Sequence, residues 1–293
     1  MSQPPPRAKF PLQLEGLNRP AKRLAAAPGA GSKAAATPVA SAIPRAEPRP
    51  VLRPQQPLQQ AALDSARRVA PSGLGLDSAG IRRRMVDRLV QAGLRDELVK
   101  GAMSEVPRHL FVDTALVNQA YEDTSLPIGH GQTISKPSVV ARMIELLMGG
   151  ANARARRSLG HTLEIGTGCG YQAAVLARLS RQVMSIERLR PLHDKAREHL
   201  APLRQMNIRL VYGDGMRGHP PNAPYDSIIA AAGGEALPDA WLEQLAVGGR
   251  LVAPVHDASG SRQVLVVVDR TADGYTRSVH EAVHFVPLKS GLD

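Results

Sequence analysis

The chain has 293 residues and a formal charge of +11, and it contains one cysteine, Cys169. A single cysteine excludes an intramolecular disulfide and any metal site built from several cysteines, so no metal is expected. No stretch is apolar enough for a membrane span, and the N-terminus lacks the apolar core of a secretory signal. We therefore expect a cytoplasmic protein that does not enter a membrane.

The first 75 residues differ in composition from the rest of the protein. Residues 1–72 hold 13 of the 24 prolines, one aromatic residue, and 11 Lys or Arg against three acids. Such a segment has too little apolar mass to offset its ordering entropy, so we predict that residues 1–75 are disordered. Most of the positive charge falls in this tail. Contact with RNA or an anionic membrane would therefore be transient, and no stable nucleic-acid partner is expected.

Residues 76–293 are long enough for one folded α/β domain. Apolar spacing predicts three helices in its first part (76–147), at residues 81–90, 96–106 and 137–147. A polar loop with the sequence LPIGHGQTIS, residues 126–135, precedes the third helix. Pro137 suits the first turn of that helix, where a missing N–H costs nothing.

Strands and helices alternate in the second part, residues 160–288. The predicted strands are 161–166, 181–187, 208–214, 225–234, 250–255, 262–270 and 282–288, and the predicted helices between them are 171–180, 190–206 and 237–249. Such alternation indicates βαβ units, hence a mostly parallel seven-stranded sheet with helices on both faces. In this architecture, ligands bind beyond the carboxyl ends of the strands.

A glycine-rich loop, LEIGTGCGYQ, follows the first strand. It departs from the G-x-G-x-x-G fingerprint of dinucleotide-binding proteins because Tyr171 stands in the third glycine position, which counts against an NAD-dependent oxidoreductase. A carboxylate just before the loop suits a cationic ligand without phosphate, as S-adenosylmethionine is. The predicted cofactor-binding residues here are Glu164, Gly166, Thr167, Gly168 and Gly170.

Acidic residues also stand at the ends of the next two strands. Glu187 lies about 20 residues past the loop, where a carboxylate can accept hydrogen bonds from both ribose hydroxyls. The third strand ends in Gly213, Asp214 and Gly215, and Asp214 is placed to meet an adenine amino group. Three binding features at successive strand ends favour a nucleoside-bearing cofactor, with S-adenosyl-L-methionine preferred.

Eight segments occur in the order of the motifs of protein-L-isoaspartate O-methyltransferases: VPRHLFV, LPIGHGQTIS, LEIGTGCGYQAAVLARL, SIER, GDG, YDSII, LEQLAVGGRLVAPV and VHFVPL. The sequence resembles this family over about residues 80–288. The resemblance implies a Rossmann-like class I methyltransferase fold. It also implies methyl transfer from S-adenosylmethionine to the side-chain-derived carboxylate of isoaspartyl residues in damaged proteins, and we expect a monomer.

The resemblance further makes Ser135 the active-site serine and places the residues just after it, including Ser138, at the cofactor. A carboxylate is already ionised at neutral pH, so the reaction needs alignment rather than a general base. We therefore assign Ser135 as an orienting donor, with Thr133 and Gln132 as substrate-binding neighbours. The alternative is that Ser135 simply caps the following helix.

Two residues depart from the family pattern. Lys136 stands where a neutral residue is usual, and Cys169 stands where serine is common. The alternatives left open are a methyltransferase that acts on RNA or a small molecule, and a catalytically inactive module that binds the cofactor.

Overall fold

The computed structural model describes residues 79–257 and 259–293. The predicted disorder of residues 1–75 and the predicted domain start at residue 76 lie outside the described residues. None of the helices in these two ranges is both long and apolar enough to cross a membrane.

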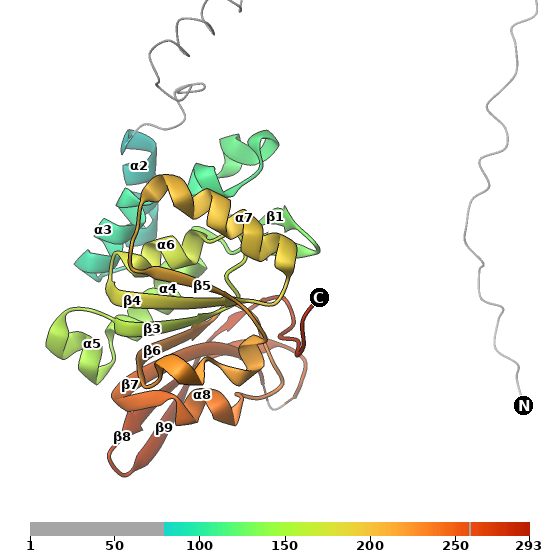
Figure 1. Ribbon diagram of the computed structural model, residues 1–293. Coiled ribbons are helices and arrows are strands. Elements are labelled where there is room, and N and C mark those ends of the chain that lie inside the picture. The colour runs from blue at the N-terminus through green and yellow to red at the C-terminus, as the bar shows by residue number, and fades with distance from the viewer. Residues whose placement is uncertain (1–78, 258) are drawn as a thin grey trace, which may run out of the picture. The chain divides into compact units, whose positions relative to one another are not determined.

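A seven-stranded sheet forms the centre of the described structure (Figure 1). Its strand order is β5-β4-β3-β6-β7-β8-β9; β3 to β7 run parallel, and β8 and β9 each run antiparallel to the strand before them. The strands are β3 (Gly160–Ile165), β4 (Ser180–Glu187), β5 (Ile208–Tyr212), β6 (Tyr225–Ala230), β7 (Leu245–His256), β8 (Gln263–Thr271) and β9 (Gly274–Val283).

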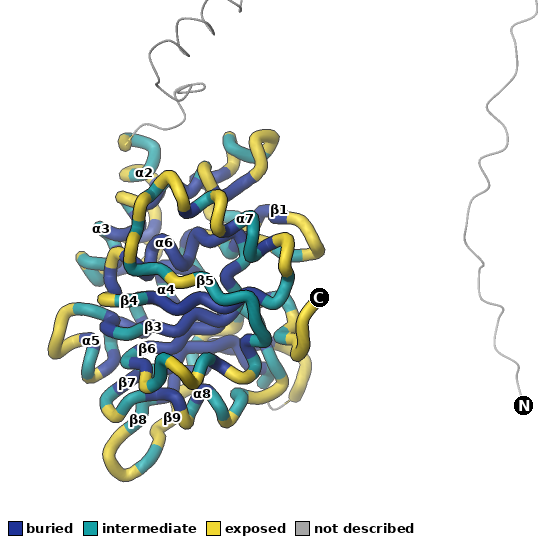
Figure 2. The backbone as a smooth tube through the Cα atoms, in the orientation of Figure 1, coloured by how far each residue is buried: buried dark blue, intermediate teal, exposed yellow. Residues whose placement is uncertain are grey.

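Helices cover both faces of this sheet, which confirms the predicted fold class. One apolar cluster joins the first face to side chains such as Met85, Ile144 and Leu192. A second cluster joins the other face to Trp241, which is fully buried near Leu163. Figure 2 shows the central strands as the most deeply buried elements. The helices are α2 (Ala79–Gln91), α3 (Glu97–Glu105), α4 (Pro137–Met148), α5 (Ala151–Arg156), α6 (Tyr171–Ala177), α7 (Arg190–Leu200) and α8 (Asp239–Glu243).

The predicted helix over residues 237–249 is wrong in its second half. Helix α8 ends at Glu243, and β7 begins at Leu245, which pairs with Tyr225 of β6. Gly248 has a φ of 78°, which no right-handed helix contains. Pairing with the neighbouring strand therefore overrides the helical spacing of this segment.

The predicted last strand, residues 282–288, is also misplaced. Strand β9 ends at Val283, and the backbone then leaves the sheet. Gly233, which follows β6, donates its N–H to the carbonyl of Val286 and accepts from the N–H of Leu288. The C-terminal segment is thereby brought to the carboxyl end of β6 instead of extending the sheet.

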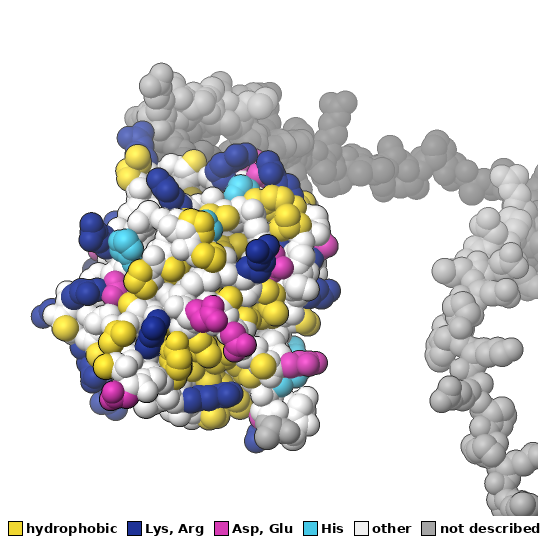
Figure 3. All heavy atoms as spheres, turned by 60° about the horizontal axis from the view of Figure 1, so that its bottom comes forward, with side chains coloured by type: hydrophobic (Ala, Val, Ile, Leu, Met, Phe, Trp, Pro, Cys, Tyr) yellow, Lys and Arg dark blue, Asp and Glu magenta, His cyan; other side chains and the backbone are white. Residues whose placement is uncertain are grey.

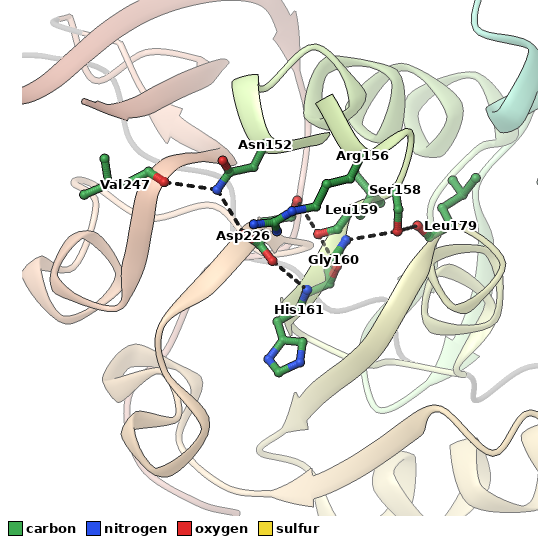
Figure 4. Close-up of polar contacts among 11 residues, drawn as sticks. Asn152, Arg156, Ser158, Leu159, Gly160, His161, Leu179, Asp226 and Val247 are labelled. Atoms are coloured by element: carbon green, nitrogen blue, oxygen red, sulfur yellow. Dashed lines mark hydrogen bonds and ion pairs between the residues drawn. The ribbon is translucent and has the colours of Figure 1, made fainter. Parts of the chain in front are cut away.

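Helix α5, which was not predicted, is held against the opposite, amino end of the central strands by Asp226 of β6 (Figure 4). The Asp226 carboxylate accepts from Asn152 Nδ2 at 3.0 Å and from the His161 N–H at 3.1 Å, and it pairs with Arg156 at 2.6 Å. Gly160 packs directly against this carboxylate with a φ of 65°, so a side chain there would be doubly unfavourable. One carboxylate thus joins three elements at the amino end of the sheet.

Charges of both signs are spread over the face shown in Figure 3. Lys and Arg side chains lie scattered there with Asp and Glu side chains among them, rather than in one band. A continuous basic stripe is the usual electrostatic footprint of a nucleic-acid-binding surface. The face in Figure 3 does not carry one.

Candidate active site

The site lies where the strand order reverses. The connections run outward from β3 through β4 to β5 and then return to β6 on the other side of β3, so a crevice is expected between the carboxyl ends of β3 and β6. A cavity of about 180 Å³ opens there. Its walls come from the glycine loop after β3, the ends of β4 and β6, the segment before α4, and the C-terminal segment.

Eight of the predicted site residues line this cavity together: Gln132, Thr133, Ser135, Gly166, Thr167, Gly168, Glu187 and Gly215. Five others lie outside its lining: Ser138, Glu164, Gly170, Gly213 and Asp214. Residues widely separated in the sequence therefore converge on one cavity, while part of the predicted cofactor set lies behind its walls or beside it.

The glycine loop owes its shape to backbone conformations that other residues rarely adopt. Gly166, Gly168 and Gly170 have φ values of 89°, 56° and 92°. The Gly168 N–H donates to Glu187 Oε2 at 2.9 Å, and the other carboxylate oxygen accepts from the N–H of Leu189. Glu187 at the end of β4 is thus already oriented by two backbone amides at the edge of the cavity.

Glu164 is completely buried beneath the loop. Ser185 donates a hydrogen bond to its Oε2 and also bonds to Thr167 Oγ1 at 2.6 Å. Burial, with a smaller contribution from the charge of Glu187, raises the pKa of Glu164 to about 8. Its Oε1 and the Nε2 of Gln172 form no hydrogen bond of good geometry among the described residues, although the Gln172 side chain lies close enough to lower the pKa of Glu164 and so partly oppose the effect of burial. Gln172 lines the cavity, and an unpaired donor there is costly unless a ligand pairs with it.

Asp214 is engaged by its own loop and by the C-terminus. Its Oδ1 accepts from the N–H of Met216, and its Oδ2 accepts from the N–H of Gly291 at 2.8 Å. Asp293 pairs with Arg188 at 2.9 Å and lines the cavity. The C-terminal residues therefore lie at the carboxyl ends of β4 and β5, which was not predicted.

The predicted polar loop of residues 126–135 is a β-hairpin, with β1 (Leu126–Gly129) paired to β2 (Gln132–Ile134). His130 and Gly131 at its tip have φ values of 53° and 67°, as the two central residues of a type I′ turn require. The sequence signal for this hairpin was present as the short His-Gly turn between two short segments with β-forming residues. Ser135 follows β2 directly and is half-buried at the cavity wall.

The Ser135 side chain does not cap helix α4. The residue at the N-cap position is Lys136, and the N–H of Ser138 is instead satisfied by Asp123 Oδ1 at 2.8 Å. The Ser135 carbonyl accepts from Arg108 at 2.8 Å, whereas its hydroxyl makes no hydrogen bond among the described residues. The capping alternative is therefore wrong, and the hydroxyl is available to a ligand.

Arg108 belongs to the segment VPRHLFV, and the sequence alone assigns it no role. Its side chain is fully buried, lies with its guanidinium carbon 4.7 Å from the centre of the Tyr171 ring, and donates to the Ser135 backbone. Nothing in its sequence surroundings distinguishes a buried arginine from an ordinary surface one.

Cys169 and His130 offer no nucleophile or base of the usual kind. Burial raises the pKa of the Cys169 thiol to about 11, so it is protonated at neutral pH. His130 is exposed at the hairpin tip. Within residues 79–257 and 259–293, no group of three His, Cys, Asp or Glu side chains is arranged to hold a metal ion.

Comparison with known proteins decides the family. The model of the protein-L-isoaspartate(D-aspartate) O-methyltransferase family matches residues 81–293. A protein-L-isoaspartate O-methyltransferase of Methylibium petroleiphilum is 62% identical over 289 residues, covering 98% of each sequence. One of Leptothrix cholodnii is 58% identical over 294 residues, covering 99% of this sequence and 96% of the relative. This chain belongs to the protein-L-isoaspartate(D-aspartate) O-methyltransferase family.

Solved structures agree with the fold of this isoaspartyl methyltransferase. A structure of a protein-L-isoaspartate O-methyltransferase matches with a TM-score of 0.64 and 27% identity, covering 72% of this protein and 67% of that one. A structure described as a Plasmodium falciparum member in complex with S-adenosyl-L-homocysteine matches with a TM-score of 0.59 and 23% identity, covering 71% and 98%. The predicted family, enzyme class and cofactor are confirmed.

The residues of this family member fit S-adenosylmethionine. Gln172 lines the cavity, and its amide Nε2, which makes no hydrogen bond among the described residues, can donate to the carboxylate at the methionine end of the cofactor. Glu187 lines the cavity with an oriented carboxylate. A Cβ at Gly215 would lie 2.6 Å from the Ile165 side chain, so this wall of the cavity requires glycine.

Proposed function

We propose that this protein methylates the free carboxylate of L-isoaspartyl residues in damaged proteins, and that Ser135 orients this carboxylate. The single observation that carries the role of Ser135 is its place at the cavity wall with a hydroxyl that has no partner among the described residues. Thr133 and Gln132, which line the same cavity, are the proposed neighbours of the substrate. The methyl ester formed in this way collapses to a succinimide in solution, so no residue is needed for that step.

The cofactor is proposed to lie along the carboxyl ends of β3, β4 and β5. Glu187 is assigned to the ribose hydroxyls and Gln172, which lines the cavity, to the methionine end, while Glu164 supports the glycine loop from below. Asp214 and Gly215 are assigned to the adenine end, and the glycine loop to the space between. When bound, S-adenosylmethionine supplies a methyl group on a sulfonium, whose departure needs no acid.

The protein is then required to align its substrate rather than to move a proton. The substrate carboxyl has an ordinary pKa near ~4 and is ionised at neutral pH. Holding two reactants in line can contribute roughly 7–11 kcal/mol. A hydroxyl donor held by a rigid hairpin meets this requirement, and an exposed His130 with a protonated Cys169 is compatible with it.

Ser135→Ala tests the assignment. We expect kcat/KM for an L-isoaspartyl peptide to fall roughly 10- to 1,000-fold, as removal of a positioned donor does, with little change in the Kd of S-adenosylmethionine. The measurement is base-labile methyl transfer to two peptides that differ only in an L-isoaspartyl or L-aspartyl linkage. Ser104→Ala, on α3, is the matched control because, among the described residues, the Ser104 hydroxyl bonds only to the Gly101 carbonyl.

Two outcomes would contradict the proposal at different levels. Wild-type activity in Ser135→Ala would remove the role of this serine while leaving the reaction intact. Cofactor binding without methylation of either peptide by the wild type would favour an RNA or small-molecule acceptor, or a catalytically inactive module.

We further propose that the enzyme acts as a cytoplasmic monomer without a stable nucleic-acid partner. A monomer suffices for the proposed site, because the residues assigned to the substrate and the cofactor all belong to one copy of the protein. Sedimentation at the concentration used for activity measures the oligomeric state directly.

A further inference from the structure

A second groove joins the cavity at Ser135. It has a volume of about 390 Å³ and shares Thr133, Ser135, Ala231 and Val286 with the cavity lining. Its remaining walls come from Ser125 before β1, from the start of α4, and from residues 282–285 at the end of β9 and just after it. A peptide whose isoaspartyl carboxylate reaches Ser135 therefore has this groove as a path for its flanking residues. This step rests on the proposed role of Ser135.

The groove carries positive charge and no negative charge. Lys136 and His284 line it, and none of its lining residues is Asp or Glu. Both side chains belong to exposed residues. Within the described ranges, the Lys136 ammonium makes no ion pair or hydrogen bond, unlike Lys100 and Lys195, which pair with acids.

Nearby acids are already engaged by other groups. Lys136 also lines a neighbouring groove that contains Glu145 and Glu281. Both acids bind Arg142, at 3.3 Å and 2.6 Å. Glu145 in addition accepts from the N–H groups of Arg95 and Asp96.

Asp123, on the loop before β1, accepts from the N–H of Ser138 and does not pair with Lys136. Among the described residues, Lys136 therefore has no counter-ion beside the substrate path. A ligand that brings a carboxylate into the groove would provide one.

We propose that this groove is a subsite for a second carboxylate of the substrate, with Lys136 as its binding cation. The enzyme then prefers isoaspartyl sites that carry an acidic residue one or two positions away, or a free C-terminal carboxylate at that distance. Because Lys136 is exposed, the preference is modest, and it is screened by salt. Lys136 binds a part of the substrate that does not react, so it determines specificity rather than catalysis.

The test compares C-terminally amidated isoaspartyl peptides that have Glu or Gln at one flanking position, placed in turn at each of the two positions on either side. We expect kcat/KM to be roughly two- to five-fold higher for the Glu peptide at the position that reaches Lys136. Lys136→Gln should remove this difference, and Lys136→Arg should keep it. Lys100→Gln, whose site on α3 is outside both the cavity and the groove, should also keep it.

Equal kcat/KM for the Glu and Gln peptides in the wild type, at all four positions, would overturn the proposal. So would a preference that persists in Lys136→Gln, or one that is unchanged between low salt and 1 M salt. Methylation of the Gln peptide by the wild type and by Lys136→Gln shows separately whether isoaspartyl methylation itself takes place. Peptides with a free instead of an amidated C-terminus distinguish a side-chain carboxylate from the terminal one.

Discussion

At the scale of single residues, Arg108 is unusual because it is a fully buried guanidinium without a carboxylate partner among the described residues. Its Nε and one terminal nitrogen have no hydrogen-bond partner there, and burial lowers its pKa. Such a charge costs stability. The contacts it does make, with the Ser135 carbonyl and the Tyr171 ring, both lie directly behind the cavity wall. We interpret Arg108 as a positioning residue that fixes the Ser135 backbone.

Arg108→Met tests this interpretation. We expect kcat/KM for an isoaspartyl peptide to fall about 10- to 100-fold, because a displacement of about 1 Å at Ser135 misaligns the carboxylate. The Tm should stay the same or rise, since an apolar side chain of similar length removes an unpaired buried charge. Arg108→Lys should recover part of the activity. Peptide kinetics and thermal unfolding measure the two effects separately.

A loss of Tm that accompanies the loss of activity would make Arg108 a structural residue instead. Undiminished kcat/KM in Arg108→Met would show that the Ser135 backbone needs no support from this side chain. The affinity for S-adenosylmethionine, measured by calorimetry, should change little in either variant.

At the scale of elements, α5 depends on one carboxylate at the amino end of the sheet. Asp226→Ala removes the acceptor for Asn152, Arg156 and the His161 N–H. We expect the free energy of unfolding to fall by about 1–3 kcal/mol, because the variant loses hydrogen bonds to a charged group and leaves N–H donors without an acceptor. Activity at 25 °C should persist, because the cavity lies at the opposite, carboxyl end of the strands.

Urea unfolding and peptide methylation on the same samples measure both quantities. Asp273→Ala, in the exposed turn between β8 and β9, is a matched control because Asp273 forms no hydrogen bond or ion pair among the described residues. A variant of Asp226 as stable as this control would show that α5 is held by its apolar contacts alone.

The elements that were predicted correctly are those with a strong local pattern. The alternation of strands and helices and the glycine loop at Gly166 follow from periodicity and turn chemistry, which act within a few residues. The start of β7 at Leu245 was missed because strand pairing with β6 overrides helical spacing there. The contact of the C-terminus with Asp214 was missed because it joins residues 77 positions apart. The position of site residues could be predicted where they directly follow a strand. It could not be predicted where contacts between distant segments determine it.

Burial of single groups was the other part that the sequence could not supply. Glu164 was predicted as a carboxylate facing a ligand, and the structure shows it enclosed under the loop. Ser135 lines the cavity, and its role there stays a prediction, whereas the sequence does not predict the arginine behind it. Local sequence contains no measure of how much protein will surround a side chain. Buried polar residues such as Glu164 and Arg108 therefore affect both the site and the stability of the whole molecule.

At the scale of the whole molecule, Glu164 should make stability depend on pH. Its pKa is raised from 4.5 to about 8 in the folded protein, mainly by burial. Well below pH 4.5 the carboxyl is protonated in both the folded and the unfolded state, so its ionisation does not change the free energy of unfolding. Between these two values the folded state holds a proton that the unfolded state has lost, so the contribution of Glu164 to the free energy of unfolding falls as pH rises, by at most about 1.4 kcal/mol per pH unit.

Glu164→Gln tests this linkage because the amide is similar in shape and cannot ionise. Other titrating groups are shared by the two proteins and cancel in the difference. The stability of the variant relative to the wild type should therefore increase from pH 5 to pH 8 and level off above it, as measured by urea unfolding at constant ionic strength without cofactor. A difference that does not change with pH would mean that Glu164 keeps an ordinary pKa in the folded protein. In that case solvent or a positively charged group would have to stabilise the ionised carboxylate of Glu164 in the folded protein.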